Sequence, residues 1–119
     1  AAAVVASNYL VTLMDLAIKL MAASGVSESE GFEILKPLIN GTLNNIETTG
    51  IPDALTGPIA RGDLGIVEKH VQAIRSMPEK KAREMAEYYN MNGLETIKVA
   101  LAKGTLSEDA AKKLRQILK

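Results

Sequence analysis

The first 26 residues are too apolar for a helix that lies on the surface of a small protein. Nineteen of them are apolar, and the main polar side chains fall at Asn8, Thr12, Asp15 and Lys19. Spacings of four, three and four residues align these side chains in one stripe of an α-helix. A helix of this kind is buried on nearly all sides. We therefore predict a long buried N-terminal helix over about residues 1–24, and a partner surface that covers it.

The rest of the sequence is also helical in its periodicity, and no alternating strand pattern occurs. The 119 residues suit one helical domain, 1–119, of the all-α class with about five helices. Further helices are predicted over about 27–50, after Asp63, over 78–102 and after Ser107, with Pro78 as a first helical residue and Gly104 as a stop. Pro37 predicts a kink or break near Lys36.

Each of these helices has one apolar face that we expect to point inward. The residues of these faces are Phe32, Leu35, Ile39, Leu43 and Ile46; Leu64, Val67, Val71 and Ile74; Ala82, Met85, Tyr89, Gly93 and Ile97; and Ala111, Leu114 and Leu118.

Composition excludes several kinds of chemistry. The chain has no cysteine and one histidine, which rules out thiol catalysis, and no metal site is expected. Residues 1–60 carry a net charge of −4 and residues 61–119 carry +4, but the C-terminal basic residues alternate with acidic ones. We therefore expect no nucleic-acid partner. The longest uncharged stretch is 1–14, and no basic segment precedes it, so we expect no membrane association and a cytoplasmic location.

The loop over residues 50–63 carries the main candidate site. Thr56, Gly57, Arg61 and Asp63 bring a hydroxyl, a guanidinium and a carboxylate onto tightly turned backbone just before a helix. Arg61 can hold a carboxylate or phosphate in a bidentate grip. The alternative is a structural turn, in which Asp63 caps the helix and Arg61 pairs with an acidic side chain.

Other polar residues are weaker candidates. Asn8 and Thr12 would hydrogen-bond a substrate at a cleft edge, or else belong to a solvent-facing stripe closed by an Asp15–Lys19 ion pair. His70 would act as a general acid or base, or else be a partly exposed packing residue. Thr42 and Asn45 form a further polar pair on the second predicted helix.

Two segments carry a resemblance to a known family. These are Ala6-Ser7-Asn8-Tyr9-Leu10 and the run Ala54-Leu55-Thr56-Gly57-Pro58-Ile59-Ala60-Arg61-Gly62-Asp63. With them the chain resembles the C-terminal helical domain of Rossmann-like NAD(P)-dependent oxidoreductases that contain a domain of unknown function. In architecture it is similar to the C-terminal domain of 6-phosphogluconate dehydrogenase and to the pyrroline-5-carboxylate and ketopantoate reductases. The likeness covers nearly the whole chain.

The resemblance implies a division of labour. An N-terminal Rossmann domain of the parent chain would bind NADP or NAD, while the helical domain closes the substrate cleft and forms a homodimer. Asn8 would face the nicotinamide or substrate, and the Thr56–Asp63 loop would line the cleft. This chain, a fragment on that view, would bind no cofactor and have no activity alone. The alternative function is a purely structural module for homodimerisation or protein interaction.

Overall fold

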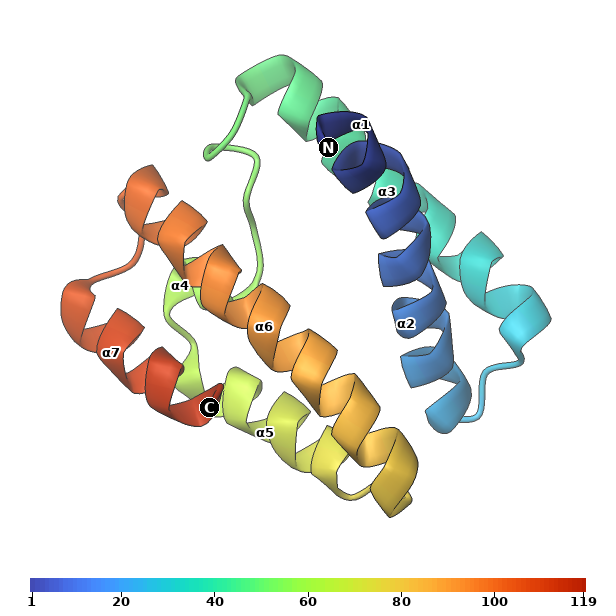
Figure 1. Ribbon diagram of the computed structural model, residues 1–119. Coiled ribbons are helices and arrows are strands. Elements are labelled where there is room, and N and C mark those ends of the chain that lie inside the picture. The colour runs from blue at the N-terminus through green and yellow to red at the C-terminus, as the bar shows by residue number, and fades with distance from the viewer. The chain divides into compact units, whose positions relative to one another are not determined.

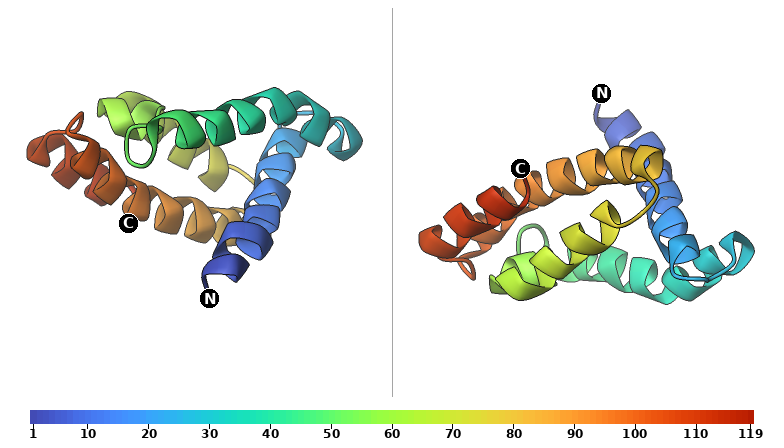
Figure 2. Two further views of the ribbon diagram at one scale, coloured as in Figure 1. Left: turned by 90° about the horizontal axis from the view of Figure 1, so that it is seen from above. Right: turned by 90° about the horizontal axis from the view of Figure 1, so that it is seen from below.

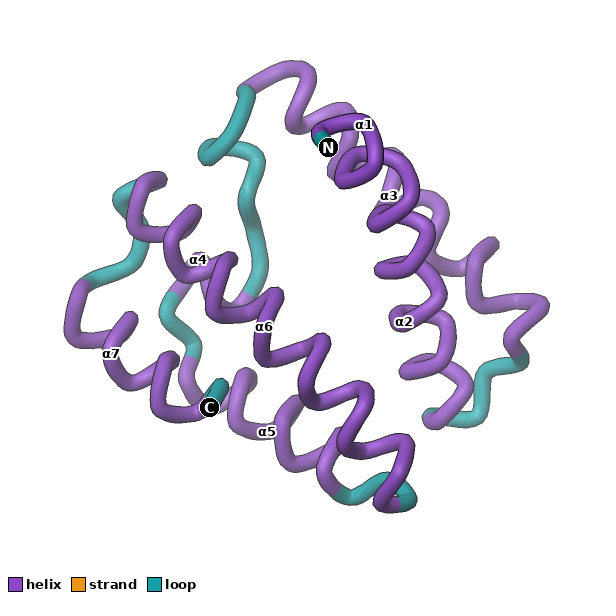
Figure 3. Tube along the Cα trace, in the orientation of Figure 1, coloured by secondary structure: helices purple, strands orange, loops and turns teal.

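The computed structural model describes residues 1–119, and every regular element in it is helical (Figures 1 and 3). The elements are α1 (Ala2–Val4), the π-helical segment η1 (Val5–Tyr9), α2 (Leu10–Ala23), α3 (Glu28–Thr49), α4 (Pro58–Arg61), α5 (Leu64–Arg75), α6 (Glu79–Lys103) and α7 (Glu108–Ile117). The first three form one continuous helix. The predicted all-α class is confirmed, and α4 is a helix that the expected five did not include.

The chain divides into two units, residues 1–44 and residues 45–119. The N-terminal unit consists of the helix formed by α1, η1 and α2, together with most of α3. These two helices meet near their connection and diverge from it (Figure 2). They approach closely at Gly31, where a Cβ atom would lie 3.2 Å from Cγ2 of Ile18.

Contrary to expectation, the N-terminal helix is not buried within this chain. No residue of α1, η1 or α2 is buried, and Val11 is 69% exposed. The predicted inner face of α3 is open as well, since Phe32 and Leu43 are exposed. A unit of two diverging helices leaves most of each helix surface uncovered, which explains both corrections.

The helix over Ala2–Ala23 has the length and the apolar composition that a membrane crossing requires. Core helices of soluble proteins and signal sequences meet the same criterion, so the observation carries little weight alone. Asp15 and Lys19 lie within this helix and form an ion pair, with 2.6 Å between the Lys19 Nζ and Asp15 Oδ2 atoms.

The C-terminal unit holds the hydrophobic core. Within it α6 lies against α4, α5 and α7, and α5 also packs against α7 (Figure 1). The core side chains are Val67, Val71, Ile97, Ala100, Leu106, Ala111, Leu114 and Leu118. Val67, Ile97 and Leu114 are completely buried, as their helical spacing predicted. This unit therefore has a core of its own.

Local signals in the sequence define most helix ends. The Asp63 carboxylate accepts a hydrogen bond of 3.2 Å from the Ile66 amide and caps α5, while Ser107 caps α7 in the same way. Gly104 ends α6 with a left-handed conformation, φ +82°. Pro78 precedes the first residue of α6, so it acts one position earlier than predicted.

Of the kink or break predicted near Lys36, the break does not occur. The helix α3 runs from Glu28 to Thr49 with this proline inside it. Proline removes one hydrogen-bond donor from the helix, and its ring crowds the carbonyl oxygen four residues earlier, although its φ angle suits a helix. The remaining hydrogen bonds of a 22-residue helix are enough to continue it past that point.

Candidate functional site

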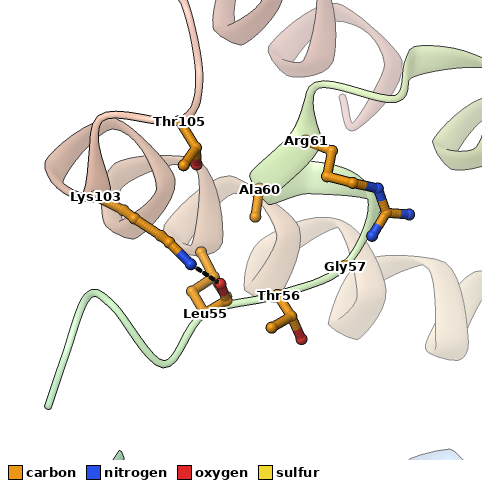
Figure 4. A pocket seen from close by; sticks show the side chains of 7 residues that line it. All are labelled: Leu55, Thr56, Gly57, Ala60, Arg61, Lys103 and Thr105. Atoms are coloured by element: carbon orange, nitrogen blue, oxygen red, sulfur yellow. Dashed lines mark hydrogen bonds between the residues drawn. The ribbon is translucent and has the colours of Figure 1, made fainter. Parts of the chain in front are cut away.

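The loop before α5 forms a shallow depression in the C-terminal unit. Its volume is about 430 Å³. The residues that line it are Leu55, Thr56, Gly57, Ala60, Arg61, Lys103 and Thr105 (Figure 4). Three of the six main site candidates, Thr56, Gly57 and Arg61, are thus brought together. They are joined by two residues from the end of α6 and the turn after it.

Lys103 fastens the loop to the end of α6. Its Nζ atom donates hydrogen bonds to the carbonyl oxygens of Asp53, at 2.9 Å, and Leu55, at 2.6 Å. An ammonium group that bonds neutral carbonyls keeps its full positive charge. Lys103 therefore both fixes the loop and adds a positive charge beside the depression.

Glycine makes the backbone path of the loop possible. Gly57 has φ +95° and Gly62 has φ +68°, values at which a side chain would be strained. Between them the chain forms the single turn of α4, which carries Ala60 and Arg61 on the depression. These glycines therefore allow a backbone path on which Thr56 and Arg61 line the same depression.

Arg61 and Asp63 do different things. Arg61 is exposed and belongs to none of the ion pairs of the chain, so the acidic partner expected on the structural alternative is missing. Asp63 caps α5 and does not line the depression. In this loop Arg61 is thus the residue with free hydrogen-bond donors, whereas the carboxylate of Asp63 has a structural role.

Asn8 and Thr12 belong to the N-terminal unit. Asn8 lies in η1, the π-helical segment of five residues. Such segments are rare, cost regular hydrogen bonding, and occur frequently at functional sites. The Thr12 hydroxyl donates to the Asn8 carbonyl oxygen at 3.2 Å. The π-helical turn is a second reason, independent of residue type, to keep Asn8 as a candidate.

The weaker candidates are placed as follows. The His70 Nδ1 atom lies 2.8 Å from the hydroxyl of Tyr89, and the two rings meet edge to face. Burial raises the pKa of the Tyr89 hydroxyl above its usual value. On α3, the Thr42 hydroxyl donates to the Leu38 carbonyl oxygen at 3.0 Å. The Asn45 carbonyl oxygen accepts from a threonine hydroxyl one turn later at 2.8 Å.

Sequence reasoning missed Lys103 and Thr105. Lys103 lies 48 residues beyond Leu55, whose carbonyl it binds, so no local pattern relates the two. The only signal was its position at the C-terminal end of the helix predicted over 78–102, which indicates a charge that suits the helix dipole rather than a loop contact.

The fold and this loop define an all-α protein with a separate N-terminal helix pair and a concave, positively charged loop site. The chain belongs to the family described as Domain of unknown function (DUF2520), whose model matches residues 1–96. This confirms the expected membership of a family with a domain of unknown function. No curated protein and no solved structure matches the chain significantly. The family match ends inside α6, so α7 lies outside it.

Proposed function

We propose that this chain is the dimerisation and substrate-cleft domain of an NAD(P)-dependent oxidoreductase and has no activity alone. The observation that carries the proposal is the unequal burial of the two units. All buried hydrophobic side chains of the core lie between Ala60 and Leu118, whereas the only buried residue of the N-terminal unit is Gly31. A helix pair of about 40 residues without a core needs a further surface to be stable.

The N-terminal unit exposes enough apolar area for one side of a dimer interface, spread over more than one side of its helices. Ten large apolar residues of this unit are exposed: Val4, Val5, Tyr9, Leu10, Val11, Leu13, Phe32, Ile34, Leu38 and Leu43. At ~150–200 Å² for a fully exposed large side chain, they offer roughly 800–1,000 Å². Each partner in a standard interface buries about 800 Å². A second copy of the unit would supply the same area in return.

A protein surface suits this unit better than a lipid bilayer. The Asp15–Lys19 pair would be costly inside a membrane. The apolar residues of α3 alternate with Glu30, Glu33 and Lys36, which can remain in water at the rim of a protein interface. A symmetric contact between two copies accommodates both features.

The cofactor would be held by another domain of the parent chain. An all-helical chain has no strand followed by a Gly-rich turn and a helix, the arrangement that binds the dinucleotide pyrophosphate. Asn8 in its π-helical turn and the loop from Thr56 to Asp63 would then face the cleft. NADP or NAD supplies hydride transfer when bound, and the helical domain would position the substrate.

The dimer is tested by multi-angle light scattering on the chain and its variants. We expect a dimer of about twice the 12.7 kDa chain mass, and monomers for Val11→Glu and Leu38→Glu. Ile66→Glu replaces an exposed apolar residue of the C-terminal unit and should leave the dimer intact. A wild-type chain that stays monomeric at high concentration contradicts the proposal.

The cleft role is tested in the full-length parent. Asn8→Ala and Arg61→Ala should lower cofactor-dependent turnover of imino and keto acids, with Lys112→Ala as a surface control. Unchanged turnover would leave only the structural dimerisation module, the alternative that the exposed N-terminal unit also favours. Calorimetry showing tight NADPH binding to this chain alone would contradict the division of labour.

A further inference from the structure

We propose that the loop depression of the C-terminal unit binds a small organic acid, with Arg61 holding its carboxylate. The inference rests on the proposed function in that this acid would be the substrate, and it deepens that function by naming the substrate class. All seven lining residues lie in the C-terminal unit, between Leu55 and Thr105. The residues that line the depression therefore belong to the part of the chain that has its own core.

The charges around the depression select an anion. Both charged lining residues, Arg61 and Lys103, are cations, and no acidic residue lines it. Their charges are not neutralised, because Arg61 forms no ion pair and Lys103 bonds two backbone carbonyl oxygens. The two acidic residues of the loop, Asp53 and Asp63, lie outside the lining. An uncompensated charge of about +2 attracts an oxyanion and disfavours a cation.

The hydrogen-bond donors suit an oxyanion as well. The guanidinium of Arg61 can give two parallel hydrogen bonds to a carboxylate or a phosphate. Thr56 and Thr105, two residues with hydroxyl groups, also line the depression, and Lys103 has a third N–H beyond the two it uses for the loop (Figure 4). Arg61 thus binds the charged group of the ligand, and Lys103 is a positioning residue that holds the loop.

The remaining surface indicates an apolar body on the ligand. Leu55 and Ala60 contribute apolar surface between the two cations (Figure 4). A volume of about 430 Å³ is much larger than one phosphate or acetate ion requires, and lies toward the small end of ligand sites. A short aliphatic chain that ends in a carboxylate uses both the apolar surface and the charge.

The test is an NMR titration of the ¹⁵N-labelled chain with butyrate. We expect amide shifts confined to the seven lining residues and their chain neighbours. The dissociation constant should be in the millimolar range, on the order of that of a small fragment. Butyramide, which has the same shape without the charge, should bind at least about tenfold more weakly. Acetate should also bind more weakly, since it lacks the apolar body. Equal binding of butyrate and butyramide, or no shift in the loop, overturns the proposal.

Variants separate the roles of the two cations. Arg61→Ala should weaken butyrate binding about 5- to 10-fold, whereas Lys112→Ala removes a surface cation on α7 and should change it less than about twofold. Lys103→Met should weaken binding and also shift the Leu55 amide without ligand, and Lys103→Arg should restore binding. A Lys103→Met chain whose loop resonances do not move would overturn the positioning role.

Two further titrations identify the source of the oxyanion and keep the proposals distinct. Inorganic phosphate or NADP binding more tightly than butyrate would assign the site to a phosphate group and overturn the organic-acid assignment. Light scattering on the same samples reports the dimer independently. A dimer that does not bind butyrate overturns this inference alone, whereas a monomer that binds it overturns only the dimerisation proposal.

Discussion

Replacing Gly93 with alanine should destabilise the C-terminal unit, although alanine is the better helix former. A Cβ atom at this position would lie 2.9 Å from Cδ1 and 3.1 Å from Cδ2 of Leu118. Favourable carbon–carbon contacts lie at about 3.5–4.0 Å, so Leu118 would have to move. Leu118 is 1% exposed and belongs to the core, which leaves it little room.

Two opposing terms set the magnitude for Gly93→Ala. Overpacking a core typically costs about 1–3 kcal/mol. Alanine gains about 1 kcal/mol over glycine in a helix interior. The free energy of unfolding should therefore fall by about 1 kcal/mol, within a range of roughly 0–2 kcal/mol. For a unit of this size that is a decrease in Tm of about 4–8 °C per kcal/mol.

The assay is urea denaturation followed by far-UV circular dichroism, with Gly65→Ala as the matched control. Gly65 lies in α5 of the same unit, and its Cβ would meet only Asp63 Oδ1, at 3.9 Å. This control should be neutral or slightly stabilising. In a Leu118→Ala background, the cost of Gly93→Ala should disappear. A Gly93→Ala chain that is as stable as Gly65→Ala would refute the packing argument.

Two more changes test a helix cap and a half-buried hydroxyl. Asp63→Ala removes the hydrogen bond from the Ile66 amide and should lower the free energy of unfolding by about 1 kcal/mol. Asp53→Ala, which removes an exposed carboxylate of the same loop, should leave it unchanged. Equal effects of the two substitutions would contradict the capping role of Asp63. Burial raises the pKa of Tyr89, so the folded state holds that proton more tightly than the unfolded state. The contribution of the Tyr89 proton to the free energy of unfolding is complete below pH about 10 and is lost as the pH rises through the raised pKa of the folded state. Urea midpoints between pH 8 and 11.5 should therefore fall less for Tyr89→Phe than for the wild type or Tyr88→Phe, and parallel curves for all three would contradict this.

The parts of the fold that the sequence predicts well are those set by neighbouring residues. Asp63 and Ser107 cap the helices they precede because each side chain reaches an amide three residues later. Val67 lies on α5 and Ile97 on α6, and each of these helices packs against three other helices of the C-terminal unit. The apolar face that the helical spacing defines is therefore the face that is buried. In each case the determining contact is local or follows from one helix face.

The parts that were missed depend on contacts that local patterns do not contain. Pro58 and Gly62 read as loop residues, yet α4 forms between them because its single turn packs against α5 and α6. The bond from Lys103 to the Leu55 carbonyl joins residues 48 apart in the sequence. The apolar composition of the N-terminal helix predicts a covering surface, but composition does not specify whether that cover comes from the same chain or from a partner.

The π-helical segment Val5–Tyr9 also sets the helical phase of the residues before it. An α-helix advances by about 100° per residue, and a π-helical turn holds one residue more than an α-helical turn. The side chains of Ala2, Ala3 and Val4 are therefore rotated about the axis by about 100° from where an unbroken 3.6-residue repeat would put them. Deletion of a single residue within η1 should restore the α-helical repeat and rotate the side chains before it by about 100° about the helix axis.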